Sequence, residues 1–202
     1  NEPLNTSTRG SRKEFPAVAV IVLEYSASPE NTNAITIYDG DDPSLPMWMK
    51  FTRGGGIGAG VNRKMIPGAD GLTSVIALNG LICISVAEAN RGGLSTISFI
   101  KDSGFFYSGT FYSGTNNASV ANRNVSYPSV VDNSLGNTVN NYSNDVAMTV
   151  LPNAPIDPDT GLPIPTIAVA TDGGVSVIKD DGTVVDIVAS LFTIVADEIE
   201  FT

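Results

Sequence analysis

The sequence contains no histidine and a single cysteine, Cys83, among its 202 residues. A Ser-His-Asp triad, a Cys-His pair, a histidine-bound haem and the usual zinc sites all need residues that are missing here. One cysteine cannot form a disulfide within the chain, and Cys83, between Ile82 and Ile84, is expected to be a small buried hydrophobe. These absences exclude the commonest nucleophilic and zinc-dependent mechanisms.

Charged residues are also scarce, and most of them are acidic. They make up 16% of the chain, against about 25% in ordinary soluble domains, and 11 Lys and Arg face 21 Asp and Glu for a net charge of −10. Such a surface repels phosphate backbones, so we expect no nucleic-acid partner. Polarity comes instead from 19 Ser, 17 Thr and 17 Asn, a composition typical of extracellular or virion β-proteins.

Long apolar runs and helical periodicity are missing too. The longest apolar run, Ala17–Leu23, has seven residues against the ~20 of a spanning helix, so no membrane span is expected. No stretch of twelve residues free of Gly and Pro repeats apolar positions with the period of a helix. Short strand-like runs are frequent instead, and we therefore predict an all-β chain with strands at Ala17–Glu24, Ala34–Tyr38, Leu72–Ala77, Leu81–Val86, Ser95–Lys101, Asp145–Leu151, Thr166–Ala170, Val175–Lys179, Val184–Val188 and Phe192–Ala196.

Asn-Gly and Asp-Gly pairs separate several of these runs. Asn79-Gly80 and Asp172-Gly173 suit the type I′ turns of hairpins, because Asn, Asp and Gly tolerate positive φ angles. Another Asp-Gly pair, Asp181-Gly182, follows the second turn. Thr166–Val188 is therefore predicted to form a three-stranded antiparallel meander.

A coarse repeat suggests how the strands are arranged. Residues 73–84 and 166–177 match in character, and their strands are apolar on both sides, as in propeller blades that are covered by their neighbours. Residues Ala17–Tyr38 resemble an earlier copy with a longer turn, and Phe192–Phe201 resembles the opening of another. Three blades and a beginning do not close a ring, because propellers have about four to eight blades. We therefore expect antiparallel meanders arranged as propeller-like blades, incomplete or completed by assembly, with a sandwich as the alternative.

The domain organisation follows from composition. Residues 1–16 form a polar N-terminal arm, and residues 17–202 form the β-blade region. Two insertions interrupt this region, at 104–144, which is rich in Asn and Ser, and at 152–165, which holds five prolines and is expected to be extended and stiff.

Three phrases carry a resemblance to a known class of proteins. Ile37–Met49 (IYDGDDPSLPMWM), Asn144–Ala154 (NDVAMTVLPNA) and Pro165–Gly182 (PTIAVATDGGVSVIKDDG) resemble segments of β-propeller-like, tail-associated structural proteins in the virions of tailed bacteriophages. The likeness spans most of residues 18–188 and transfers no functional residue. It implies a non-enzymatic component of a tail or tail fibre, in an oligomer with other virion subunits and attached to the host surface.

An aromatic duplication is the best candidate for recognition. The pentapeptide Phe-Tyr-Ser-Gly-Thr occurs twice in succession, at 106–110 and 111–115. Because core strands tolerate such a duplication poorly, we expect it at the edge of the fold. Aromatic rings flanked by Ser, Thr and Asn suit sugars, so the alternative function is a carbohydrate-binding adhesion module that contacts a host surface glycan. Packing in the core or between subunits is the competing interpretation for the candidate contact residues Phe106, Tyr107, Phe111, Tyr112 and Trp48.

Acidic clusters suggest two further activities. Asp157-Pro158-Asp159-Thr160-Gly161 begins like a calcium loop, but Ala168 stands where the bidentate Glu is needed. We expect Asp157 and Asp159 to form a turn and no cofactor to bind, with calcium at these two residues as the alternative. Paired carboxylates about 5–9.5 Å apart could also hydrolyse glycans. That is the lowest-ranked alternative, because every Asp cluster lies beside glycine in a turn that water can reach, and we expect no enzyme activity.

Overall fold

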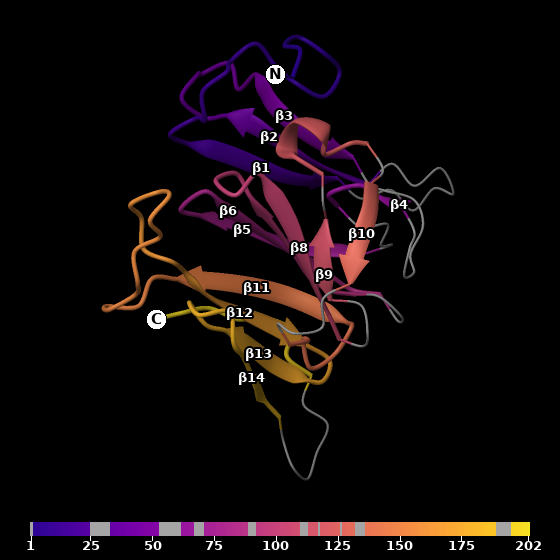
Figure 1. The fold of residues 1–202 in the computed structure, drawn as a ribbon, viewed down its shortest axis with the longest axis vertical. Helices are drawn as coiled ribbons and strands as arrows, with labels where there is room; N and C mark the ends of the chain where they lie inside the picture. The colour runs from indigo at the N-terminus through magenta and orange to yellow at the C-terminus, as the bar shows by residue number, and fades with distance from the viewer. Residues whose placement is uncertain are drawn as a thin grey trace.

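The computed structural model describes residues 2–24, 33–52, 62–66, 71–88, 92–109, 113–116, 118–125, 127–131, 136–188 and 195–202. These residues form three antiparallel sheets (Figure 1). The N-terminal sheet has the order β1-β2-β3 and the C-terminal sheet the order β11-β12-β13-β14, and between them lies a central sheet with the order β4-β10-β9-β8-β7-β6-β5. The only helical turn in the described part is a 3-10 segment, η1 (Val120–Asn122).

The strand bounds follow the chain in order. The N-terminal sheet contains β1 (Ala19–Glu24), β2 (Ala34–Asp39) and β3 (Met47–Thr52). The central sheet contains β4 (Asn62–Arg63), β5 (Leu72–Leu78), β6 (Leu81–Val86), β7 (Gly93–Ser98), β8 (Ser103–Ser108), β9 (Gly114–Asn116) and β10 (Tyr127–Val131). The C-terminal sheet contains β11 (Ser143–Thr149), β12 (Thr166–Thr171), β13 (Gly174–Ile178) and β14 (Val184–Ile187).

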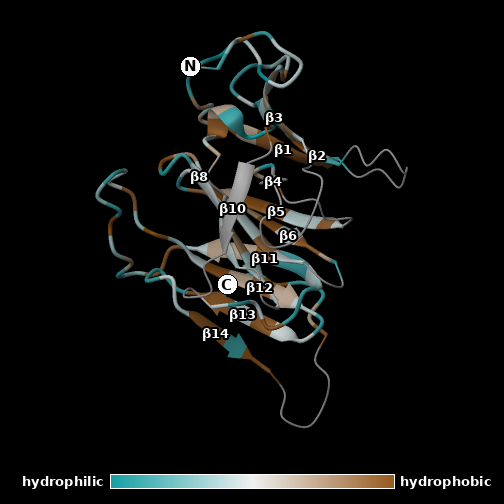
Figure 2. Cartoon of the chain, turned by 45° about the vertical axis from the view of Figure 1, so that its right-hand side comes forward, coloured by the Kyte–Doolittle hydropathy of each residue, from teal (hydrophilic) through white to brown (hydrophobic). Residues whose placement is uncertain are grey.

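Strands β6 and β7 of the central sheet are buried on both faces. On β6, Ile82 and Ile84 belong to a core shared with the N-terminal sheet, whereas Cys83 belongs to a second core shared with the C-terminal sheet. Successive side chains of a strand point to opposite faces, so β6 needs apolar residues on both faces to fill both cores, and Ser85 is its one polar residue. Figure 2 shows the matching hydrophobic colour along β5 and β6.

This layering explains the pattern that suggested propeller blades. A strand between two layers and a strand between two blades need the same apolar residues on both faces. The all-β prediction is confirmed, whereas the propeller is not, because none of the three sheets closes on itself. The alternative of stacked meanders packed as a sandwich fits the structure.

The predicted meander at Thr166–Val188 is confirmed. Strand β12 pairs with β13 and β13 with β14, both antiparallel. Of the two predicted type I′ turns, one is confirmed and one differs. Asn79 and Gly80 both have positive φ angles, of 51° and 75°, as a type I′ turn requires. In the Asp172-Gly173 turn the positive φ falls on the next residue, Gly174.

The segment 104–144 is part of the middle of the fold rather than an excursion between blades. It supplies most of β8 together with β9, β10 and η1, and β8 lies between β7 and β9 in the central sheet. Of the other predicted strands, Phe192–Ala196 lies almost entirely outside the described residues. No helix in the described part of the chain is long and apolar enough to cross a membrane.

Candidate ligand-binding cleft

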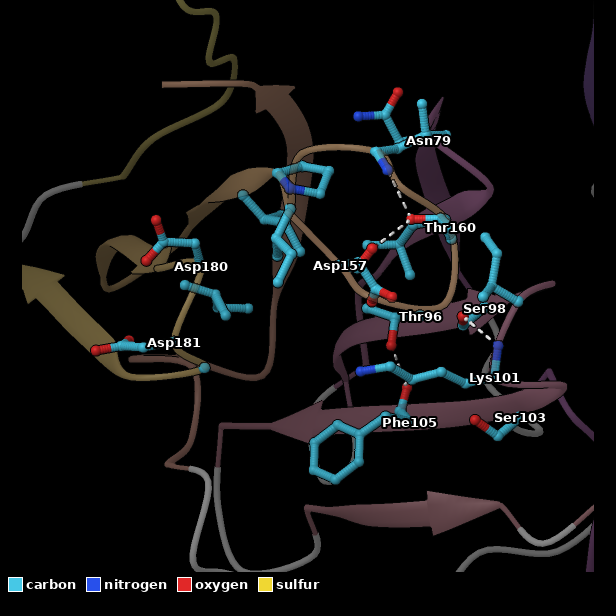
Figure 3. Close-up of a pocket in the computed structure, with 18 of the residues that line it drawn as sticks. Asn79, Thr96, Ser98, Lys101, Ser103, Phe105, Asp157, Thr160, Asp180 and Asp181 are labelled. Atoms are coloured by element: carbon cyan, nitrogen blue, oxygen red, sulfur yellow. Dashed lines mark hydrogen bonds between the residues drawn. The ribbon is translucent and has the colours of Figure 1, made fainter. Parts of the chain in front are cut away.

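A cleft of about 420 Å³ lies at one end of the contact between the central and C-terminal sheets (Figure 3). The β5–β6, β7–β8 and β13–β14 turns meet there with residues 151–165, which we call the proline hairpin. The volume of the cleft falls within the range of roughly 300–1,000 Å³ that is typical of small-molecule sites. Turns and a hairpin thus surround a space that opens where two buried sheet faces end.

The floor of the cleft is apolar and aromatic. Phe105 and Tyr107 alternate along β8 and therefore face the same side, with ring centroids 4.6 Å apart at an interplanar angle of 62°. Ile167 and Ile178, which pair across β12 and β13, complete the floor from the opposite sheet. Burial raises the pKa of Tyr107 to about 12, so its hydroxyl is a neutral hydrogen-bond donor at physiological pH.

The walls of the cleft are polar. Asp180 and Asp181 lie on the β13–β14 turn, and Lys101 lies on the β7–β8 turn, where its backbone N–H donates to Ser98 Oγ at 3.0 Å. The hydroxyl and backbone N–H of Thr183 donate to Asp181 Oδ1 at 2.6 and 2.9 Å. These bonds hold the pKa of Asp181 below its usual range, so this carboxylate stays ionised.

The proline hairpin forms the remaining wall, and it is not the extended segment that its prolines suggested. The backbone N–H of Asp157 donates to Leu162 O at 2.9 Å, and that of Ile164 donates to Pro155 O at 2.9 Å. A bridge also joins Ile156 to Pro163. Prolines lack the N–H that a continued ladder needs, so the segment folds back on itself with only these few bonds.

Asp157 and Asp159, the candidate calcium ligands, have different surroundings. Asp157 lines the cleft, and its Oδ1 accepts a hydrogen bond of 2.9 Å from the backbone N–H of Asp159. The side chain of Asp159 is exposed and takes no part in the lining. Among the described residues no three His, Cys, Asp or Glu side chains converge on a common point. Calcium at this loop stays a prediction.

The described part of the aromatic duplication does not lie at the edge of the fold. Phe106 and Tyr107 are 7% and 9% exposed, so the prediction that they lie at the edge of the fold is wrong. The reason is that the two copies pair as a hairpin, with Phe106 opposite Gly114, and this hairpin belongs to the doubly covered central sheet. Tyr107 nevertheless reaches the cleft. Phe111 and Tyr112 lie outside the described residues.

Trp48 is a packing residue on the other side of the central sheet. It is buried on β3, its ring centroid lies 4.8 Å from that of Phe15 and 5.6 Å from that of Phe99, and the Arg9 guanidinium lies 4.9 Å above it. It belongs to the core between the N-terminal and central sheets, whereas the cleft extends from the other core. The structure therefore does not bring Trp48 together with Tyr107.

Sequence reasoning missed several residues of the cleft. Phe105 directly precedes the duplication, and its two-residue spacing from Tyr107 was the available signal, because both must share a face of one strand. Lys101, Thr160 and Asp180 come from three different turns and gave no such signal.

Comparisons with known proteins found no counterpart. No protein-family model matches the sequence, and searches of curated proteins and of solved structures returned no similar protein.

Proposed function

We propose that this protein is a non-enzymatic carbohydrate-binding module and that the cleft holds a neutral saccharide. The observation that carries the proposal is the pair of rings, Phe105 and Tyr107, beside the polar groups of three turns and a hairpin. Carbohydrate binding was expected from the aromatic duplication, and we now assign it to the cleft.

The chemistry of the cleft matches that of a sugar ring. A pyranose has an apolar face of C–H groups and an edge of hydroxyls, so it needs an apolar floor and hydrogen-bonding walls. Phe105 and Tyr107 supply the floor, and the carboxylate of Asp157 supplies an acceptor for hydroxyl groups. Lys101 supplies donors.

The charge of the cleft favours a neutral saccharide over an acidic one. Three carboxylates, those of Asp157, Asp180 and Asp181, face two ammonium groups, those of Lys101 and Lys179, within a chain of net charge −10. A uronic or sialic acid would add like charge to this site. We therefore assign the cleft to sugars without a carboxylate.

The surroundings of Asp181 suit binding better than they suit the acid of a glycosidase. A glycosidase needs one carboxyl group with a raised pKa to protonate the leaving oxygen. Asp181 has a lowered pKa, because Thr183 donates two hydrogen bonds to its ionised form. We give it the role of a hydrogen-bond acceptor.

Replacing Phe105 by leucine should weaken saccharide binding about tenfold while the protein stays folded, because leucine keeps apolar volume and removes the ring. Lys101→Ala should weaken binding several-fold, whereas Lys13→Ala, an exposed lysine of the N-terminal arm, should leave it unchanged. Calorimetry with malto-, cello- and chito-oligosaccharides of two to six sugars measures the affinities. Absence of binding to any of them by the unmodified protein, or equal affinities for Phe105→Leu and Lys13→Ala, would overturn the proposal.

A second candidate function, assembly as a subunit of a phage tail, is favoured by the edge of β14. This strand is last in its sheet (Figure 2), and no described residue pairs with its outer edge. Val185 and Ile187 on this strand are exposed. Exposed apolar edge strands template pairing with another chain.

If β14 mediates assembly, Val185→Lys should shift an oligomer to monomer, whereas Val125→Lys, at an exposed position that follows η1 and lies outside the strands, should not. Light scattering after gel filtration, over a hundredfold range of protein concentration, reports the mass. A chain that is monomeric throughout this range would count against assembly of this chain alone and leave the saccharide proposal intact.

A further inference from the structure

We infer that Asn79 is the positioning residue that holds the proline hairpin over the cleft and thereby sets the affinity of the saccharide site. The effect on binding rests on the proposed function, but the contact between Asn79 and the hairpin can be measured without any sugar. The latch is the hydrogen bond that Asn79 Nδ2 donates to Pro163 O at 2.8 Å, between residues 84 positions apart.

This bond is the only one that ties the hairpin to another element within the described residues. The other backbone bonds of residues 151–165, such as Asp157 N–H to Leu162 O and Gly161 N–H to Asp157 O, are internal to the hairpin. The side-chain bonds of Asp157 and Thr160 are internal as well. Such a hairpin can keep its own shape and still change its position, so its place over the cleft depends on Asn79.

Little apolar burial holds the hairpin in place. Ile156 and Leu162 are 58% and 43% exposed, so much of their surface contributes nothing to docking. Only Pro165, where the hairpin joins β12, is fully buried among its five prolines. One direct hydrogen bond therefore has a large share in fixing this wall.

Both the backbone conformation and the side chain of Asn79 suit this contact. Its φ angle of 51° lies in the left-handed region, which asparagine tolerates better than most residues. The turn is itself anchored, because the backbone N–H of Phe99 donates to Gly80 O at 3.0 Å. A short amide on a held turn presents its donor to Pro163 O, as Figure 3 places Asn79 beside the hairpin residue Thr160.

The latch governs one whole wall of the site. Figure 3 shows Asp157 and Thr160 on the opposite side of the cleft from the β13–β14 turn, which carries Asp180 and Asp181. Together with Leu162 they are part of the wall that the hairpin contributes. When the hairpin moves, these groups no longer meet a sugar held on the rings of Phe105 and Tyr107. Loss of the latch should therefore weaken binding without altering the floor.

Two variants of Asn79 separate the latch from charge and from backbone strain. Asn79→Asp keeps the shape and the tolerance of positive φ but replaces the donor by an acceptor that faces a carbonyl oxygen. Asn79→Gly keeps the backbone freedom and removes the side chain without adding charge. The matched control is Asn153→Asp, which adds the same charge at an exposed position of the hairpin and leaves the latch intact.

The experiment has two readouts on the full chain. Backbone ¹⁵N order parameters of Asp157, Gly161 and Ile164 should fall below about 0.7 in both Asn79 variants and stay near 0.85 in the unmodified protein and in Asn153→Asp. Calorimetry with malto-, cello- and chito-oligosaccharides should show about fivefold weaker binding for the Asn79 variants alone. Thermal unfolding followed by the fluorescence of Trp48, the only tryptophan, confirms that all variants are folded.

The outcomes distinguish this inference from the proposed function. Unchanged order parameters in both Asn79 variants would overturn the latch, whatever binds. Lowered order parameters with unchanged affinities would overturn the effect on binding. An unmodified protein that binds none of the oligosaccharides would overturn the proposed function and with it the link to affinity, while the order parameters would still decide whether Asn79 positions the hairpin.

Discussion

Arg123→Met should lower the free energy of unfolding by about 3–5 kcal/mol, the largest effect expected of any single side chain here. Arg123 is 1% exposed and all five of its N–H groups have an acceptor within 2.9 Å. Two go to the Glu2 carboxylate, and the others go to backbone oxygens of Lys50, Thr8 and Val120. This one guanidinium therefore joins the N-terminal arm, β3 and η1.

The cost arises from the groups left behind. Methionine fills part of the volume over the Phe51 ring, which lies 5.3 Å from the guanidinium carbon, but it leaves the partly buried Glu2 carboxylate without its closest partner. Three carbonyl groups also lose one donor each, but each keeps another: Lys50 O that of Asn124 Nδ2, Thr8 O the N–H of Lys50 and Val120 O the backbone N–H of residue 123. The unpaired carboxylate is therefore the main cost. Urea unfolding followed by Trp48 fluorescence measures the difference.

Two comparisons test this explanation. Adding Glu2→Gln to Arg123→Met should recover part of the loss, because the unpaired charge is removed. Arg12→Ala breaks a more exposed ion pair, with Asp39 and Asp41 at 2.8 Å, and should cost much less than Arg123→Met. Equal losses for Arg12→Ala and Arg123→Met would contradict the view that burial sets the cost.

The sequence was sufficient for features that depend on local patterns. The strands β1, β2, β6 and β12 lie within one or two residues of the predicted runs, because each is a short apolar segment next to a polar stretch. The apolar character of both faces was also informative, yet it indicates only that two layers cover a strand. Whether those layers are neighbouring blades or stacked sheets depends on long-range packing that no local pattern encodes.

Arg123 shows where sequence reasoning stops. It is the last basic residue before a stretch of more than fifty residues without one, and nothing near it in the chain marks it as buried. Its partners Glu2 and Thr8 lie 121 and 115 positions away. An isolated arginine is ordinarily exposed, so only the tertiary structure shows that it is in the core.

The candidate site was predictable only in part, because its residues come from distant parts of the chain. Tyr107 and Asp157 were both singled out, but for separate roles, and the structure brings them to one cleft. Their meeting depends on how the β8 strand of one sheet faces the hairpin that precedes β12 of another. Asn79 was recognised as a turn residue, whereas its side-chain bond to Pro163 could not be inferred from the turn.

Gly93→Ala should destabilise the protein by about 3 kcal/mol, because two separate costs act at this residue. Its φ of +140° is a conformation that residues with a side chain rarely adopt. An added Cβ would also lie 1.9 Å from Tyr107 O, so β7 and β8 would have to separate. Since β8 carries the aromatic floor of the cleft, saccharide affinity should fall together with stability.

Gly161→Ala isolates the first of these costs. Gly161 also has a positive φ, of +68°, but no heavy atom lies within 4 Å of the position that its Cβ would take. It should therefore lose only about 1 kcal/mol, the cost of the left-handed backbone alone. If urea unfolding gave the same loss for both variants, backbone strain would account for Gly93, and the close approach of β7 to Tyr107 O would not be what requires glycine there. A loss several-fold larger at Gly93 would instead assign this glycine to the spacing of the two strands that support the cleft.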